Sequence, residues 1–286
     1  MSTQHTLIGG LVSVDLDGPL RRRCGQLLLH GLLFSVVALL IPWTLGIEHP
    51  GLISVFLVAA SLRDHLVMLL DENRERIWGG LMPAGEANRE TSISLLALFL
   101  GTFFGYFGIA LWLGTSQLPA TFGALLTVTP ATGGSLLEVG HFGSFVGVLG
   151  HNLSVMVAIF AIAALYRAYG AVLVLSWNAA VWATVLCVLG TQAAQSSSGS
   201  GLLLFGGSAV AVMPHLTAEA LGYCIAAISA IFASLAIAKY ELTDPRIRSV
   251  MGSVGTLLVT AIVLLALGAA LEAHYAPGLL ALLAAP

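Results

Sequence analysis

The chain has 286 residues, of which 58% are hydrophobic and only 9% are charged, and its mean hydropathy is +0.96. A soluble domain carries about 25% charged residues, so this composition excludes an ordinary soluble enzyme and indicates a multi-pass helical protein in a lipid bilayer. The net charge of −3, with 11 Lys and Arg, leaves no basic patch for nucleic acid. Three widely spaced cysteines indicate neither a disulfide framework nor a metal site, and no cofactor is expected.

Residues 1–24 are predicted to be a cytoplasmic segment, because three arginines at 21–23 directly precede the first apolar stretch. Residues 26–46 form this stretch, and we interpret it as a retained span because no clear cleavage site of small residues follows. Residues 51–70 are interrupted by charged side chains, so they either cross the membrane or lie at its surface. If they cross, residues 25–70 form an N-terminal transmembrane hairpin.

The most polar stretch of the chain, residues 71–90, is predicted to be a cytoplasmic loop with a short helix. The following apolar run, residues 91–114, is the clearest span, and it contains glycines in GxxxG spacing. This spacing places two small residues on one helix face, where another helix can approach closely. Four glycines are therefore expected to pack against partner proteins or a second copy of the chain: Gly101, Gly105, Gly143 and Gly147.

Residues 115–141 contain no Lys or Arg and are predicted to be an external loop, with a partly embedded piece at 121–129. Two further spans are predicted at 142–165 and 169–190, and Tyr166 with Arg167 makes the tight turn between them. A flexible Gly/Ser link then ends at residue 201.

Residues 202–240 are too long for one straight crossing, because a helix of that length would reach about 58 Å across a hydrocarbon core of about 30 Å. Pro214 is the expected break, since proline removes a backbone donor and clashes with the preceding turn. We predict a half-segment at 202–212 and a crossing at 216–238.

A last span at 251–271 precedes an external C-terminal tail, residues 273–286. If residues 51–70 cross, seven spans place the N-terminus in the cytoplasm and all 11 basic residues on that side, as the positive-inside bias favours. We therefore predict an all-α polytopic bundle of seven spans, with five or six as alternatives, in which residues 91–272 form a five-span domain.

Ionisable residues inside spans are costly and are functional candidates. His215 and Glu219 are the strongest pair, because a spacing of four places both on one helix face directly after Pro214. The pair could bind a proton or cation, or it could be a hydrogen-bonded pair that pins the helix to its neighbours. Glu138 and His141 lie three residues apart before a span, where a solvated loop end is the favoured interpretation.

Two asparagines, Asn152 and Asn178, fall in consecutive spans and are expected to hydrogen-bond across helices. His151 points about 100° around the helix from Asn152, so the two need not share a partner. His30 is interpreted as a buried hydrogen-bonded histidine rather than a ligand. The motifs of zinc, serine and aspartyl intramembrane proteases are absent, so no catalytic residue is predicted and a non-enzymatic role is favoured over an enzyme.

Over residues 88–271 the order of features resembles the stage II sporulation protein M family of prokaryotic integral membrane proteins. The phrase MPHLTAEALG at 213–222 is similar to the family's proline-histidine motif, and GHNLSVMVAIFAIAAL at 150–165 is similar to its asparagine-containing span. VLVLSWNAAVWATVL at 172–186 resembles the next span. The family-type positions are Asn152, Asn178, Pro214, His215 and Glu219, and the chain departs from the family pattern at His151 and Leu216.

The resemblance implies a non-enzymatic scaffold or assembly component of a cell-envelope complex in the prokaryotic plasma membrane. Its partners would be other membrane or envelope proteins, with homo-oligomerisation as an alternative. A second hypothesis of another class is a transporter or ion pathway, in which His215 and Glu219 form a site on a discontinuous helix.

Overall fold

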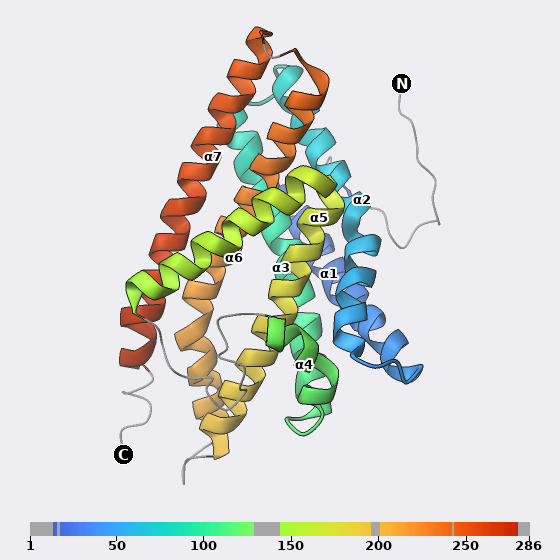
Figure 1. Ribbon diagram of the computed structural model, residues 1–286, viewed down its shortest axis with the longest axis vertical. Helices are drawn as coiled ribbons and strands as arrows, with labels where there is room; N and C mark the ends of the chain where they lie inside the picture. The colour runs from blue at the N-terminus through green and yellow to red at the C-terminus, as the bar shows by residue number, and fades with distance from the viewer. Residues whose placement is uncertain (1–13, 16–17, 129–143, 196–200, 242, 280–286) are drawn as a thin grey trace.

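The computed structural model describes residues 14–15, 18–128, 144–195, 201–241 and 243–279, and these residues form helices and no strand. The long helices run side by side along the longest axis of the molecule (Figure 1). In chain order the elements are α1 Leu20–Thr44, α2 Pro50–Trp78, α3 Ala84–Leu113, α4 Leu118–Val128, α5 Phe145–Gln195, α6 Gly201–Lys239, α7 Pro245–Ala270 and the π-helical turn η3 Leu271–Tyr275.

Six of these helices, all except α4 and η3, are long and apolar enough to cross a membrane. The longest, α5, leaves helical geometry at Arg167, where φ is 53° and ψ is −132°. Its first arm rises to a corner at this residue and its second arm descends from it (Figure 1). The two arms correspond to the spans predicted on either side of Tyr166 and Arg167. With α5 supplying two arms, the all-α polytopic bundle predicted from the sequence is confirmed.

Two predicted boundaries near the N-terminal half differ from the structure. Residues 51–70 lie within α2, which has the length and hydropathy of a span. Residues 71–90 are not a loop, because α2 continues to Trp78 and α3 begins at Ala84. The chain turns between them with Gly80 at φ +70°, a conformation that glycine adopts without a steric penalty. The helices therefore extend their polar ends beyond the apolar section as a helical hairpin.

The predicted break at Pro214 is wrong, because α6 is one continuous helix from Gly201 to Lys239 with Pro214 inside it. Proline is tolerated within membrane helices where neighbouring groups and small local adjustments satisfy the freed backbone carbonyls. The predicted tail is also partly helical, since the chain continues through η3 and remains helical to residue 279. The described part of the piece expected at 121–129, residues 121–128, belongs to α4, whose Phe122 and Leu125 are buried.

Helices α1 and α3 make the closest contact in the bundle, through glycines on both sides. A Cβ on Gly101 would overlap the backbone carbonyl of Leu28, and one on Gly105 would overlap Ser35. A Cβ on Gly31 of α1 would likewise meet the backbone of α3. The GxxxG pair is therefore used inside the chain, and the expectation that it packs against a partner or a second copy is wrong.

A network of four charged side chains also joins α1 and α3, together with α2. Arg23 of α1 is only 3% exposed and bonds Glu72 of α2 at 3.2 Å and Glu90 of α3 at 3.0 Å. Arg76 of α2 contacts the same two carboxylates, that of Glu90 at 2.8 Å. Because every buried charge has an opposite charge beside it, the network avoids the cost of an unpaired buried ion.

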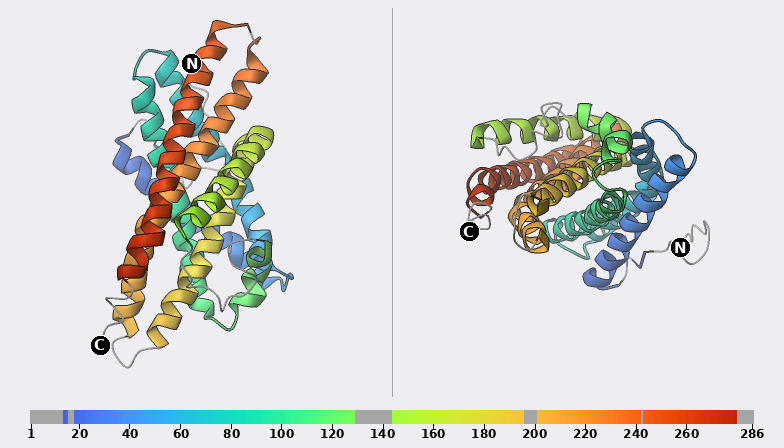
Figure 2. Two further views of the ribbon diagram at one scale, coloured as in Figure 1. Left: turned by 60° about the vertical axis from the view of Figure 1, so that its left-hand side comes forward. Right: turned by 90° about the horizontal axis from the view of Figure 1, so that it is seen from below.

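The edges of the bundle are formed by α7 on one side and α2 on the other (Figure 1). The first arm of α5 crosses the outside of the bundle at a slant, as two further views show (Figure 2). Helices α3, α5 and α6 form the interior of the bundle, since their spans are the most buried. Large exposed apolar side chains on α7 and α1 mark surfaces that suit lipid, for example Val263 and Leu33.

The contact between α1 and α3 predicts that Gly101→Ala destabilises the protein by about 1 to 3 kcal/mol, because the added methyl group overlaps a packed backbone. Gly108→Ala is the matched control on the same helix, since a Cβ there meets no atom within 4 Å. Its effect should be neutral or stabilising by up to about 1 kcal/mol, because alanine favours helix. Thermal unfolding in detergent measures both variants, and equal stabilities would contradict the packing described.

Candidate polar site between α5, α6 and α7

A buried carboxylate near the middle of α6 organises the polar site. Glu219 is 4% exposed, and its Oε1 accepts a hydrogen bond of 2.7 Å from Nδ2 of Asn152 on the first arm of α5. The amide oxygen of Asn152 accepts in turn from the hydroxyl group of Tyr223, at 3.0 Å. Tyr223 follows Glu219 by four residues, so one face of α6 holds both ends of this chain of hydrogen bonds.

Helix α7 closes the site from the opposite side. A Cβ on Gly268 would lie 2.6 Å from Cγ of Glu219, so only glycine permits this close approach. The half-buried Glu272 follows Gly268 by four residues, so it lies about one turn beyond this contact on the same side of the helix. Glu272 belongs to the π-helical turn η3, and such turns occur frequently at functional sites.

His215 does not form the predicted pair with Glu219. The imidazole is 5% exposed and its Nδ1 has no hydrogen-bond partner among the described residues, while the carboxylate is bonded to Asn152. The spacing of four places both side chains on one face, but it does not decide which partner each one takes. The neighbouring helix offers an amide donor, and the carboxylate takes that interhelical bond instead.

The other sequence candidates have different surroundings. Asn178 donates to the backbone carbonyl of Val174 in its own helix at 2.8 Å, so its expected bond across helices is wrong. His151 is half-buried beside Asn152, and Pro214 is exposed. Gly147 is exposed and its space is open apart from Ser144. Three candidates lie outside the described residues: Glu138, His141 and Gly143.

A second buried polar pair lies between α1 and α2. Nδ1 of His30 and Nε2 of His65 are 2.9 Å apart, and the two rings meet edge to face. The interpretation of His30 as a buried hydrogen-bonded histidine is confirmed. Nδ1 of His65 has no hydrogen-bond partner among the described residues.

Chemically, the site contains the buried carboxyl group of Glu219, and a second carboxyl group, that of Glu272, lies on the helical segment packed against it. A carboxyl group buried within a membrane bundle can take up a proton or bind a cation. Asn152 and Tyr223 supply one amide and one hydroxyl group that orient the first carboxyl group. The arrangement can therefore hold a proton or a monovalent cation, or it can serve only to join α5, α6 and α7.

Two members of the site, Tyr223 and Glu272, were not among the residues predicted from the sequence. The spacing of four between Glu219 and Tyr223 was a usable signal, because it places both on one face of a span. Glu272 gave a weaker signal, since it lies one residue past the predicted end of the last span. His65 was also overlooked because it sits among charged residues that suggested an interface.

The fold and these buried polar groups define a class: the chain is a multi-pass helical membrane protein with ionisable side chains inside its bundle. Comparisons with protein families, with curated proteins and with solved structures find no match.

The geometry predicts that Asn152→Ala and Glu219→Ala are coupled in a double-mutant cycle. Hydrogen bonds across membrane helices contribute about 0.6 to 2 kcal/mol, so the double variant should lose about 1 kcal/mol less than the sum of the single variants. His215→Ala with Glu219→Ala is the control cycle, because no hydrogen bond joins these two side chains in the described structure. Unfolding in detergent measures both cycles, and a larger coupling for His215 would restore the pair predicted from the sequence.

Proposed function

We propose that this protein is a non-enzymatic scaffold of a prokaryotic cell-envelope complex. The observation that carries the proposal is the tip of the α2–α3 hairpin, where two large apolar side chains stand in water-accessible positions. Trp78 is 55% exposed and Leu81 is 79% exposed, at the end of a helical pair that is otherwise polar. Aromatic and aliphatic side chains exposed in this way are typical anchors of protein interfaces.

The hairpin is fixed in place by ion pairs and hydrogen bonds, so it presents these side chains in a defined position. Glu72 and Arg76 hold α2 to α1 and to α3 through the four-charge network. Behind that network, Asn73 donates to both Asn88 and Thr91, each at 3.0 Å, and this links α2 to α3 again. Since the hairpin is ordered before a partner binds, binding at its tip would lose little conformational entropy.

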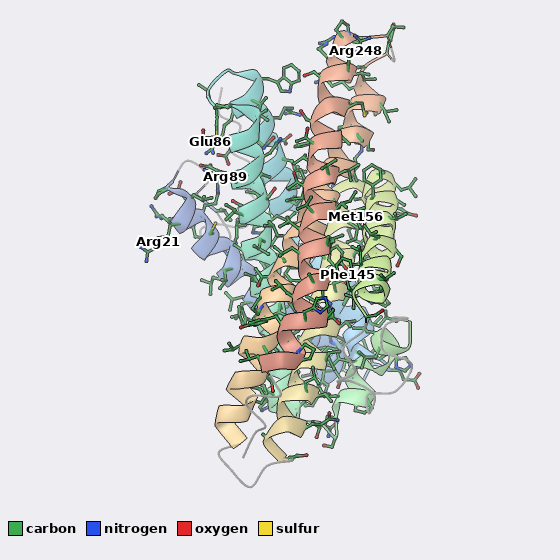
Figure 3. All side chains as sticks on the ribbon, turned by 90° about the vertical axis from the view of Figure 1, so that its left-hand side faces the viewer. Arg21, Glu86, Arg89, Phe145, Met156 and Arg248 are labelled. Atoms are coloured by element: carbon green, nitrogen blue, oxygen red, sulfur yellow. The ribbon has the colours of Figure 1, made fainter. Side chains whose placement is uncertain are left out.

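The proposed orientation places the hairpin and the N-terminus in the cytoplasm and the C-terminus outside. Arg248 and Arg89 lie in the upper part of the molecule and Arg21 lies at about mid-height, near the ends of three different helices (Figure 3). An excess of basic residues favours the cytoplasmic side. The resemblance of residues 88–271 to stage II sporulation protein M supports the same location, the plasma membrane, and the same kind of role.

The scaffold proposal predicts that a photo-crosslinking residue at Leu81 captures a defined envelope protein in living cells. The double variant Trp78→Ala, Leu81→Ser should reduce this captured protein at least about tenfold, because the loss of two apolar anchors costs more than about 1.4 kcal/mol. The control probe stands at Leu45, which is 70% exposed in the turn between α1 and α2 at the other end of the bundle.

Equal capture from Leu81 and Leu45, or capture that survives the double variant, would contradict the proposal. The same two positions test the orientation when each carries a single cysteine in a cysteine-free background. A membrane-impermeant thiol reagent added to intact cells should label Leu45→Cys and spare Leu81→Cys, and the reversed pattern would invert the topology.

A second candidate function is an ion or proton pathway, and the buried Glu219, with Glu272 about one turn beyond its contact with α7, favours it. The sequence-based argument for this function required a broken α6 and a His215–Glu219 pair, and neither is present among the described residues. The argument now depends on the buried carboxyl group of Glu219. Intramembrane carboxyl groups that bind protons or cations are typical of such pathways.

In proteoliposomes, the pathway hypothesis predicts that Glu219→Gln abolishes a proton or sodium flux that the wild-type protein supports. Glutamine keeps the shape and the hydrogen-bond acceptor but removes the charge that the cargo would neutralise. Glu86→Gln on the exposed hairpin is the matched control and should leave the flux unchanged. Identical fluxes for all three proteins would remove this candidate.

A further inference from the structure

Helix α2 carries two adjacent charges on its outward face, Arg63 and Asp64. Their side chains are 58% and 76% exposed, and the guanidinium and carboxylate groups are 3.8 Å apart. Arg23 offers a contrast, because it is 3% exposed and bonds two carboxylates from other helices at 3.0 to 3.2 Å. The pair on α2 is therefore only loosely neutralised within the chain.

The depth of this pair follows from its position along α2. The helix begins at Pro50, and Glu72 of the charge network lies about 33 Å further along, close to the thickness of a hydrocarbon core. Arg63 lies about 20 Å from Pro50 and about 13 Å short of Glu72. Both charges thus fall within the membrane-spanning part of the helix, where a charge facing lipid is costly.

The surface around the pair is available to another protein. α2 lies at the edge of the bundle opposite α7 (Figure 1). A stripe of exposed residues at helical spacing runs along its outward face: Phe56, Ala60, Arg63, Asp64 and Val67. The small side chain of Ala60 sits one turn before the charges and permits a neighbouring helix to approach closely.

We propose that this stripe is a dimer interface with a second copy of the same chain. A two-fold axis along the membrane normal keeps every residue at the same depth in both copies, so adjacent residues of opposite charge can meet reciprocally. Arg63 of each copy then faces Asp64 of the other, and one symmetry operation satisfies all four charges. The inference rests on α2 alone and does not require the scaffold role.

A second copy suits this surface better than lipid. A lipid headgroup reached by Arg63 would leave Asp64 facing hydrocarbon, whereas a copy of the chain supplies a guanidinium and a carboxylate together. The contact is self-complementary because the two charges are neighbours in sequence and of opposite sign.

The deciding experiment measures energy transfer between donor- and acceptor-labelled protein in liposomes of neutral lipid. The wild-type chain should dimerise, and Arg63→Asp or Asp64→Arg alone should each raise the dissociation constant at least about tenfold, because like charges then meet in hydrocarbon. A mixture of the two reversed chains should recover the transfer, since one carries two carboxylates and the other two guanidinium groups. A purely internal role of the pair cannot produce recovery between different chains.

The control reversals are Asp71→Arg and Arg74→Asp, a pair on the same helix at the level of the network, with both side chains about half exposed and 3.2 Å apart. Solvated charges of this kind contribute little, so these reversals should change the dissociation constant less than about fivefold. If the reversals at 63 and 64 prevent insertion, Ala60→Trp tests the same interface by blocking close approach. Wild-type protein that stays monomeric at every dilution, or reversed chains that dimerise like wild type, would overturn the proposal.

Discussion

A polar group inside a bilayer finds no partner in the hydrocarbon, so the protein itself must supply one. This constraint accounts for several of the polar contacts that join one helix to another. Glu219 takes its donor from Asn152 on α5, and His30 meets His65 on the neighbouring helix. Arg23 takes two acceptors from α2 and α3. Each of these bonds links different helices, so satisfying the polar groups also aligns the bundle.

Apolar side chains gain little from leaving lipid for the protein interior. Association of the helices therefore depends also on close van der Waals packing. The α1–α3 contact illustrates this, since Gly31 and Gly101 bring the two backbones together with no side chain between them. Gly268 plays a related part at the polar site, where it lets α7 approach Glu219. Glycine therefore serves two purposes here: it increases dispersion contact, and it brings charged groups within reach of one another.

Most of the helical architecture could be predicted from the sequence, because apolar length and basic residues carry that information. The corner of α5 at Arg167 and the span within 51–70 both follow from these two signals. The continuity of α6 at Pro214 could not be predicted, since the tolerance of an internal proline depends on neighbours that the sequence does not place. The polar ends of α2 and α3 were assigned to a loop because charge alone does not separate a solvated helix from a coil.

Several residues of the site could be predicted from the sequence, but their hydrogen-bond partners could not. Helical periodicity placed His215 and Glu219 on one face correctly, but the choice of partner depends on how α5 and α7 cross α6. Asn152 and Asn178 looked equivalent in sequence, yet one bonds across helices and the other bonds its own turn. An amide can satisfy itself locally through the carbonyl four residues earlier, so only the presence of a nearby acceptor such as Glu219 distinguishes the two.

The contrast between Arg23 and Arg63 applies the same constraint to the surface of the bundle. Both arginines lie on membrane-length helices, but one is enclosed by carboxylates from two helices and the other is more than half exposed. The interior network pairs its charges at 3.0 to 3.2 Å around Arg23, whereas the pair on α2 is 3.8 Å apart and faces outward. A second molecule would add a closer partner for each of these two charges, and a copy of the same chain carries both at the same depth.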